Sequence, residues 1–557
     1  MKSSSSVMCD LTFFSKVQVV LVLSVLVLSI FFQSIFVQVH AADCEESQAD
    51  LAGAFPQYWG IDEHSTRFVP AEHTTINATN VHQLKLKWAY GLESNSPRSY
   101  PLVTKDTIFF GDSGAGLLAL DRETGCVRWR HEDSEADVAS AILSRVTESG
   151  LTLYFTSRRE GVFAVDAATG KTLWKASIDD EPVPLYSGTP LLAQGKIFVP
   201  ISSEEIGLSL NPFYGCCTTS GGMAAFDATT GEQLWYLPTI EEPAQVIGRH
   251  FFFVEEWGPS GVPVWSAPTF DAESGLLFYG TGENYTEPAT LTSDAIFAVD
   301  AATGQRRWVK QFTAGDTFNM GCVIGGPNCP DSPGPDLDFG APPVLANNGR
   351  GETVLYAGQK SGHVHAMNPR TGDVYWSKHL SRGGYLGGIH WGIAADEQAG
   401  LLYVPISDFP SGGHSDLPAV PGMFALNLSD GTIRWKNLQD TDSVAGFWPG
   451  LSAGIVAAQG LVVAGDLAGG IAAYSAQDGS VLWQFDTAKT FTTVNGVPAT
   501  GASIDSHGPL LVDDLLIVAS GYGGVSMQPG NALLVFQLVE DSVDASQTNS
   551  LEGVASE

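Results

Sequence analysis

The chain has 557 residues, and its 61 acidic residues face only 28 basic ones, which gives a formal net charge of −33. Such an excess of negative charge argues against nucleic acid and anionic membrane surfaces as partners, because both would repel the chain. The length allows either several domains or one large repeat fold.

The chain begins with an apolar segment at residues 17–37, which follows Lys2 and Lys16 and ends in small residues near Ala41. This pattern predicts a secretory signal peptide over residues 1–41, and the length of the run keeps a retained membrane anchor as the alternative. Beyond this segment six cysteines remain, an even number that suits an oxidising compartment. We therefore expect a secreted or periplasmic protein, with no membrane contact unless the segment is kept as an anchor.

After an N-terminal extension at residues 42–83, a repeated pattern determines the predicted architecture. Seven segments share an alternating apolar strand, an Asp, Asn or Ser turn that closes on Gly, and a second strand that contains a Trp: Trp129, Trp174, Trp235, Trp308, Trp376, Trp435 and Trp483. This is the turn chemistry and period of a β-hairpin. Trp88 lies in an eighth such strand, and its missing partner occurs at residues 531–538.

The split repeat predicts how the fold closes. If the strand around Trp88 pairs with residues 531–538, the two chain ends complete one sheet and no long sheet edge stays exposed. We therefore predict an all-β, eight-bladed β-propeller of four-stranded antiparallel blades over residues 84–540. Residues 541–557 are acidic and polar and are predicted to be a disordered tail.

Long insertions between Trp174 and Trp435 contain the unusual cysteines. Cys322 and Cys329 are expected to close one loop, and Cys44 and Cys126 have no assigned partner. Cys216 and Cys217 are adjacent in a Gly-rich stretch, where a bridge closes almost no loop and so stabilises little through chain entropy. A strained pair of this kind is typical of functional positions.

The same insertions contain the polar and aromatic residues that could form a site. Each alone can be an ordinary turn or core residue. Together they would suit a hard metal ion beneath a flat anionic ligand. If the blades bring them to the propeller axis, the set offers acidic and amide groups, a cation, an imidazole and two indoles. The candidates are Glu204, Glu205, Trp265, Glu283, Asn284, Asp316, Lys360, His390 and Trp391.

Several ordered stretches carry a resemblance to a known family: "YGCCTTSGG", "TAGDTFNMGC", "GPDLDFGAPP", "AGQKSGHV" and "GGIHWG". With the repeat, they resemble the quinoprotein alcohol dehydrogenases, and among these the branch that acts on polyvinyl alcohol, over roughly residues 54–538. The resemblance implies an eight-bladed propeller that binds pyrroloquinoline quinone and calcium. It also implies oxidation of an alcohol, secondary or polymeric, to a carbonyl by hydride transfer to the quinone.

The resemblance also implies residue roles. Glu205, with Glu204 as a rival, matches a calcium-binding glutamate, and Glu283 and Asn284 share the position of a calcium-binding amide. Asp316 matches the acid that lies by the metal and takes the alcohol proton, and Lys360 matches a cation against the quinone oxygens.

Five further residues are expected to contact the cofactor. Trp265 matches the indole beneath the quinone ring, and His390 and Trp391 are expected beside it. The Cys216–Cys217 pair either covers the opposite face of the ring or only shapes the loop.

The chain has no Cys-x-x-Cys-His motif, so we expect no attached haem, and electrons would pass to an external acceptor. Two alternatives stay open. One is a non-enzymatic propeller that keeps the repeat as a scaffold or binding surface, and the other is a different enzyme on the same ring.

Overall fold

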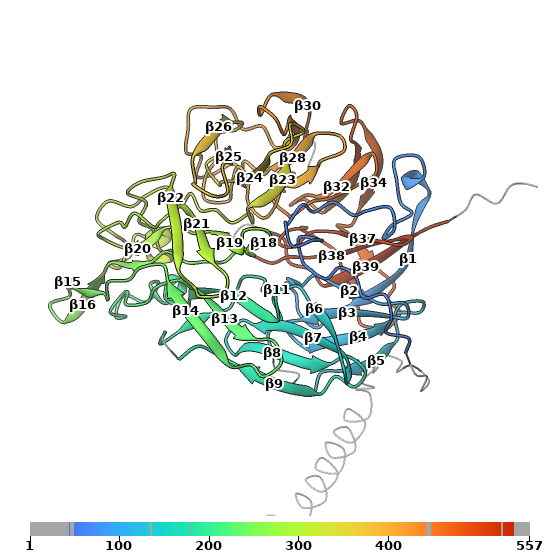
Figure 1. The fold of residues 1–557 in the computed structure, drawn as a ribbon, viewed down its shortest axis with the longest axis horizontal. Helices are drawn as coiled ribbons and strands as arrows, with labels where there is room; N and C mark the ends of the chain where they lie inside the picture. The colour runs from blue at the N-terminus through green and yellow to red at the C-terminus, as the bar shows by residue number, and fades with distance from the viewer. Residues whose placement is uncertain are drawn as a thin grey trace, which may run out of the picture. The chain divides into compact units, whose positions relative to one another are not determined.

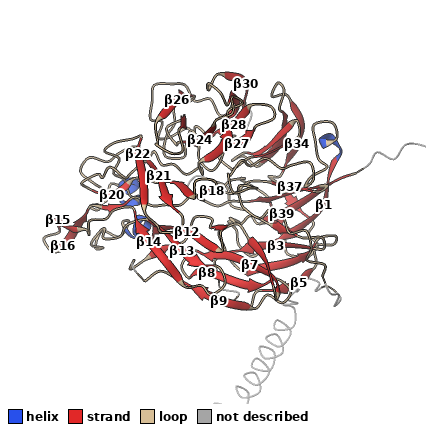
Figure 2. Cartoon of the chain, viewed as in Figure 1, coloured by secondary structure: helices blue, strands red, loops and turns tan. Residues whose placement is uncertain are grey.

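The computed structural model describes Cys44 and residues 49–133, 136–179, 181–441, 447–524 and 527–539. The predicted signal peptide or anchor (residues 1–41) and the predicted tail (residues 541–557) lie outside the described residues. The described chain is nearly all strand and loop, arranged as sheets around a common centre (Figures 1 and 2). Within this part of the chain, no helix has the length and apolar character that a bilayer crossing needs.

The first four blades follow one another along the chain, each a meander of antiparallel strands, with a short additional strand, β10, in the third. Their strands are β2 (Leu102–Val103), β3 (Thr107–Asp112), β4 (Gly116–Asp121) and β5 (Val127–Arg130); β6 (Leu143–Thr147), β7 (Gly150–Ser157), β8 (Gly161–Asp166) and β9 (Thr172–Ala176); β10 (Pro184–Leu185), β11 (Leu191–Ala193), β12 (Lys196–Ser203), β13 (Gly222–Asp227) and β14 (Gln233–Pro238); and β18 (Thr269–Asp271), β19 (Leu276–Gly280), β21 (Ala295–Asp300) and β22 (Arg306–Gln311).

The next three blades repeat the same meander, and the eighth joins the two ends of the chain. Their strands are β23 (Val344–Asn347), β24 (Thr353–Gly358), β25 (His363–Met367) and β26 (Val374–His379); β27 (Ala394–Asp396), β28 (Leu401–Ile406), β29 (Gly422–Asn427) and β30 (Ile433–Leu438); β31 (Val456–Ala458), β32 (Leu461–Gly465), β33 (Gly470–Ser475) and β34 (Val481–Asp486); and β37 (Leu510–Val512), β38 (Leu515–Ser520), β39 (Ala532–Leu538) and β1 (Leu84–Gly91).

The eighth blade confirms the predicted closure. Strand β1, which contains Trp88, pairs antiparallel with β39 from Leu84 opposite Leu538 to Gly91 opposite Ala532. The last blade is thus completed by the first strand of the repeat, and the eight-bladed propeller predicted from the sequence is confirmed.

The repeated Gly and Trp explain how neighbouring blades pack. In the turn before β22, Gly304 has a φ of 74°, the left-handed conformation that glycine adopts without strain, and a Cβ there would lie 2.8 Å from the Trp235 ring of the preceding blade. The Trp235 Nε1 also donates to the Ala301 carbonyl at 3.3 Å. The same contact joins Trp129 to Gly170 and Trp435 to Gly479. The tryptophan of one blade therefore docks on the turn of the next, except for Trp483, whose neighbour is the split eighth blade.

The N-terminal extension ties distant blades together. The backbone N–H of Phe55 donates to Val103 of the first blade, and that of Val69 donates to Ala457 of the seventh. Disulfide Cys44–Cys126 links the start of the described chain to the first blade, a pairing the sequence left unassigned. The predicted Cys322–Cys329 disulfide is confirmed.

The long insertions form elements outside the blade meanders. They are η1 (Val81–Gln83), α2 (Glu205–Leu208), η2 (Met320–Ile324), the hairpin of β15 (Gln245–His250) and β16 (Val254–Gly258), the pair β17 (Ser260–Gly261) and β20 (Asn284–Thr286), and the pair β35 (Thr490–Phe491) and β36 (Ala499–Thr500). Most belong to the third and fourth blades, where they surround a cavity.

Candidate active site

A cavity of about 230 Å³ lies among the insertions of the third to fifth blades. It is lined by Leu185, Ser187, Ser202, Ile206, Pro263, Trp265, Glu283, Tyr285, Phe318, Met320, Asp336, Asp338 and Lys360. Glu283 directly precedes β20, the two aspartates lie in the loop between η2 and β23, and Lys360 follows β24. Residues from separate blades thus meet at one place.

Three carboxyl groups converge in this cavity. One oxygen each from Glu283, Asp336 and Asp338 lies within 4.8 Å of the others. The Lys360 Nζ donates to Asp336 Oδ1 at 2.7 Å and to Asp338 Oδ2 at 2.9 Å. The Trp265 Nε1 donates to the same Asp338 oxygen at 2.9 Å. We call these three carboxyl groups the carboxylate triad.

The single positive charge of Lys360 does not balance the three negative charges of the ionised triad. Burial raises the pKa of Glu283 well above its usual value, and the neighbouring Asp338 and Asp336 carboxylates raise it further. Burial also raises the pKa of Asp336 to about 8, although Lys360 opposes this shift. Burial acts on Asp338 as well, but Lys360 and its hydrogen bonds outweigh burial, so the Asp338 pKa is lowered. A divalent cation among these oxygens would remove the repulsion.

Asp316, expected as metal ligand and base, does not line this cavity. Its carboxylate accepts from the backbone N–H of Asp336 at 3.1 Å and of Leu337 at 2.9 Å. Asp316 therefore lies behind the loop that carries two members of the triad and holds that loop in place.

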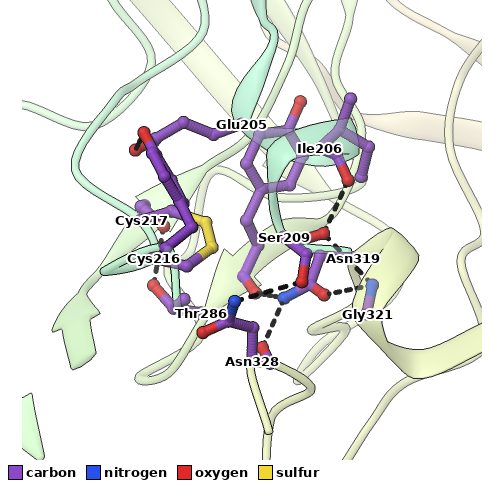
Figure 3. Close-up of a disulfide and its surroundings, with 12 residues drawn as sticks. Glu205, Ile206, Ser209, Cys216, Cys217, Thr286, Asn319, Gly321 and Asn328 are labelled. Atoms are coloured by element: carbon purple, nitrogen blue, oxygen red, sulfur yellow. Dashed lines mark hydrogen bonds between the residues drawn. A yellow bond between two sulfur atoms is a disulfide. The ribbon is translucent and has the colours of Figure 1, made fainter. Parts of the chain in front are cut away.

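Glu205, expected as a calcium ligand, is not a member of the triad and does not line the cavity. It begins α2, and its carboxylate accepts from the Tyr214 hydroxyl at 2.8 Å and from the backbone N–H groups of Thr218 and Thr219, both at 2.8 Å. Its rival Glu204 forms an ion pair with Arg159. These contacts use the Glu205 oxygens to fix the loop that carries the two cysteines (Figure 3).

The structure separates Glu283 from Asn284, which the sequence could not. Glu283 faces the cavity. The Asn284 Nδ2 donates to the Ser260 carbonyl at 3.1 Å, and its Oδ1 accepts from the Thr290 N–H at 2.7 Å. Asn284 therefore links β17 to β20. It follows Glu283 in the sequence but is not a member of the triad.

An aromatic wall stands on one side of the cavity. The Lys360 Nζ lies 5.4 Å from the centre of the Trp265 ring, and the Trp391 ring meets Trp265 edge-on at 5.2 Å. His390 lies against Trp265 at 5.6 Å, and its Nδ1 is hydrogen-bonded to the Ser452 hydroxyl at 2.8 Å. Burial, and then Lys360, lowers the pKa of His390 to about 3, so this imidazole is neutral. Trp265 lines the cavity, and His390 and Trp391 support it from behind.

The Cys216–Cys217 disulfide is buried (Figure 3), and neither cysteine lines the cavity. It packs with Tyr285 and Ile206, and both of these residues line the cavity. Cys216 also lines a separate groove on the outer side. The disulfide therefore supports the wall, and its predicted contact with the cofactor stays a prediction.

Asp336 and Asp338 were not among the candidate residues from the sequence, although the stretch "GPDLDFGAPP" contains both. The two acids are separated by one residue, but Asp336 has a left-handed φ of 57°, so the side-chain alternation of an extended strand does not bring them together. Two acids in so short a stretch, just before a blade, are the signal that could have found them.

Comparisons with known proteins agree with this architecture. The family model described as "Glucose/ethanol/alcohol dehydrogenase, beta-propeller domain" matches residues 56–324, and a second, described as "Outer membrane protein assembly factor BamB", matches residues 292–551. A polyvinylalcohol dehydrogenase of Pseudomonas sp is 34% identical over 506 residues, which cover 86% of this chain and 76% of the relative. A polyvinylalcohol dehydrogenase of Sphingopyxis sp. (strain 113P3) is 33% identical, covering 85% of this chain and 73% of the relative.

Solved structures share the fold. The quinohemoprotein alcohol dehydrogenase from Comamonas testosteroni matches with a TM-score of 0.63 and 20% identity, covering 88% of this chain and 81% of that one. A europium-containing methanol dehydrogenase matches with a TM-score of 0.65 and 18% identity, covering 87% and 98% of the two chains. Given these matches and the closed ring of eight blades, the chain belongs to the pyrroloquinoline quinone-dependent alcohol dehydrogenase family and is an oxidoreductase.

Proposed function

We propose that the protein oxidises the secondary alcohols of a hydroxylated polymer to carbonyls, with pyrroloquinoline quinone as the hydride acceptor and a calcium ion in the carboxylate triad. The observation that carries the proposal is the meeting of Glu283, Asp336 and Asp338 with Lys360 in one buried cavity. The polymer is suggested by the two polyvinylalcohol dehydrogenases to which the chain is similar.

The donor set fits calcium. Three carboxylates with one lysine leave an excess of two negative charges when all are ionised, and oxygen-only ligands are those that calcium prefers. Glu283, Asp336 and Asp338 would hold the ion, and Glu205, Asn284 and Asp316 would support the loops around it.

The walls of the cavity fit a flat, anionic quinone. Trp265 offers an indole face, and Lys360 offers a cation next to that face. When bound, calcium and the quinone would supply a Lewis acid and a two-electron acceptor.

Asp336 is the residue we assign as general base. Its side chain is 14% exposed, against 5% for Asp338, so it is the more accessible to an alcohol. In this role Asp336 takes the hydroxyl proton of the substrate at a carboxylate oxygen. Lys360, whose ammonium is fixed by both aspartates, stabilises negative charge that develops nearby.

Secretion and an external electron acceptor complete the proposal. Three disulfides suit an oxidising compartment, and the sequence carries no haem-attachment motif. Electrons would therefore leave to a separate carrier.

The test is reconstitution of the full chain with calcium and pyrroloquinoline quinone. We expect uptake of the quinone, followed by dye reduction with polyvinyl alcohol and with the small secondary alcohol pentane-2,4-diol. Failure of the chain to take up quinone or to reduce dye with either alcohol would contradict the proposal and favour a scaffold that keeps the family fold.

A further inference from the structure

The β15–β16 hairpin exposes three consecutive phenylalanines at its tip. Phe252 is fully exposed, and Phe253 and Phe251 are 70% and 47% exposed. The hairpin extends from the third and fourth blades at the edge of the molecule (Figure 1). Contiguous exposed apolar surface of this kind is typical of an interaction site rather than of an ordinary loop tip.

The tip is held in this arrangement by specific contacts. His250 Nδ1 is hydrogen-bonded to Glu256 across the hairpin at 3.1 Å, and its Nε2 to the Pro212 carbonyl at 2.9 Å. The ring of Phe251 lies 5.7 Å from that of Phe213 on a neighbouring loop. Phe251 and Phe252 have φ values of 49° and 68°, a left-handed conformation that bulky residues seldom adopt. The two phenylalanines thus adopt a backbone conformation that is unfavourable for them and expose their rings to water. A combination of this kind suggests a function.

A groove of about 350 Å³ lies at the base of the hairpin. Ile247 of β15, Pro327 and Pro330 supply apolar wall, and Glu256, Glu287 and Asp331 supply carboxylates. None of the described residues that line it is basic. The groove therefore offers methylene-binding surface beside hydrogen-bond acceptors, which suits a ligand with alternating apolar and hydroxyl groups.

The groove is separated from the active-site cavity by one layer of side chains. Cys216 lines the groove and packs in the same cluster as Tyr285, which lines the cavity. A long polymer extends beyond the cavity that holds its reacting alcohol and can use a second binding surface nearby, whereas a small alcohol cannot.

We propose that the groove and the aromatic hairpin bind a second segment of the hydroxylated hydrocarbon polymer whose oxidation is proposed above, and the inference rests on that function. The methylene backbone packs on the phenylalanine and proline rings, and the hydroxyl groups donate to Glu256, Glu287 and Asp331. The groove and the polymer are chemically complementary, because the carboxylates of the groove accept hydrogen bonds and the polymer is rich in hydroxyl donors. Anionic polymers and anionic lipids would be repelled by the same carboxylates.

The experiment measures polymer binding and oxidation separately. Electrophoresis of the full chain through native gels containing polyvinyl alcohol measures binding without any cofactor, and the reconstituted enzyme is assayed on polyvinyl alcohol and on pentane-2,4-diol. The test variant combines Phe251→Ser, Phe252→Ser and Phe253→Ser. A second variant, Ile247→Arg, obstructs the groove without altering the tip. The control is Tyr375→Ser, which removes a 51% exposed aromatic side chain from β26.

We expect both test variants to weaken polymer binding and to lower kcat/KM for the polymer about tenfold, with kcat/KM for the diol changed less than twofold. The control should match the unmodified chain. Equal polymer binding by all proteins, or an equal loss on polymer and diol, would overturn the inference. Hairpin-dependent binding to phosphatidylcholine vesicles in place of the polymer would overturn it as well. If polymer binding follows the hairpin but neither alcohol is oxidised, the proposed function fails while the polymer site stands.

Discussion

Two aspartates near Lys360 differ in what their oxygens contact. The Asp336 carboxylate accepts a hydrogen bond from the Lys360 ammonium and lines the cavity, whereas the Asp316 carboxylate accepts from the backbone N–H groups of Asp336 and Leu337. The first arrangement suits a group that exchanges a proton, and the second suits a group that fixes a loop.

This difference predicts contrasting mutant behaviour. Asp336→Asn should lower kcat by about 10²- to 10⁴-fold, because the amide cannot accept the proton, while quinone uptake persists. Asp316→Ala should lower kcat by up to about 100-fold through misplacement of the loop. Asp316→Asn should recover part of the loss, since its single amide oxygen can accept from only one of the two backbone N–H groups that the carboxylate binds. Steady-state dye reduction measures both. Failure of Asp316→Asn to recover activity, together with an active Asp336→Asn, would identify Asp316 as the base.

At the scale of the blade, the docking of Trp on Gly holds neighbouring sheets together. Gly304 and Gly275 belong to the same blade, and both are left-handed, with φ values of 74° and 70°. Only at Gly304 would a Cβ meet the Trp235 ring, at 2.8 Å, whereas nothing lies within 4 Å of a Cβ at Gly275. Alanine substitutions at Gly275 and Gly304 can therefore distinguish the cost of backbone strain from the cost of disturbed packing between blades.

We predict that Gly275→Ala lowers the free energy of unfolding by about 1 kcal/mol, from the left-handed backbone alone. Gly304→Ala should lower it by about 1–3 kcal/mol more, because the methyl group overpacks the tryptophan contact. Urea unfolding followed by tryptophan fluorescence measures both. An equal loss in the two variants would show that the contact does not couple the blades.

Repeated elements of this kind are what the sequence predicts well. Each hairpin is specified within about thirteen residues by alternation, a turn closing on Gly and a Trp, so the eight blades and their closure follow from local pattern. The insertions have no such period. Asp336 was therefore missed, and Glu205 was expected at the metal although its carboxylate contacts Thr218 and Thr219.

Over the whole molecule, the packing of neighbouring blades brings the proposed site together. Glu283 comes from the fourth blade, Asp336 and Asp338 from the connection to the fifth, and Lys360 from the fifth itself. Contacts among segments so distant in sequence depend on the finished fold, as does the Cys44–Cys126 disulfide, which spans 82 residues. Lys360 and Trp265 were nevertheless found from the sequence, because their short motifs stand in a recognisable order, and the structure brings both to the cavity.

We propose that Glu283, Asp336 and Asp338 form the metal site. Equilibrium dialysis of the full chain against calcium, with pyrroloquinoline quinone present, tests this assignment. We predict one tightly bound calcium ion per chain, lost in Glu283→Gln and in Asp338→Asn and kept in Asn284→Ala and Glu205→Gln. Calcium binding that survives Glu283→Gln and disappears in Glu205→Gln would show that Glu205, and not the carboxylate triad, holds the ion.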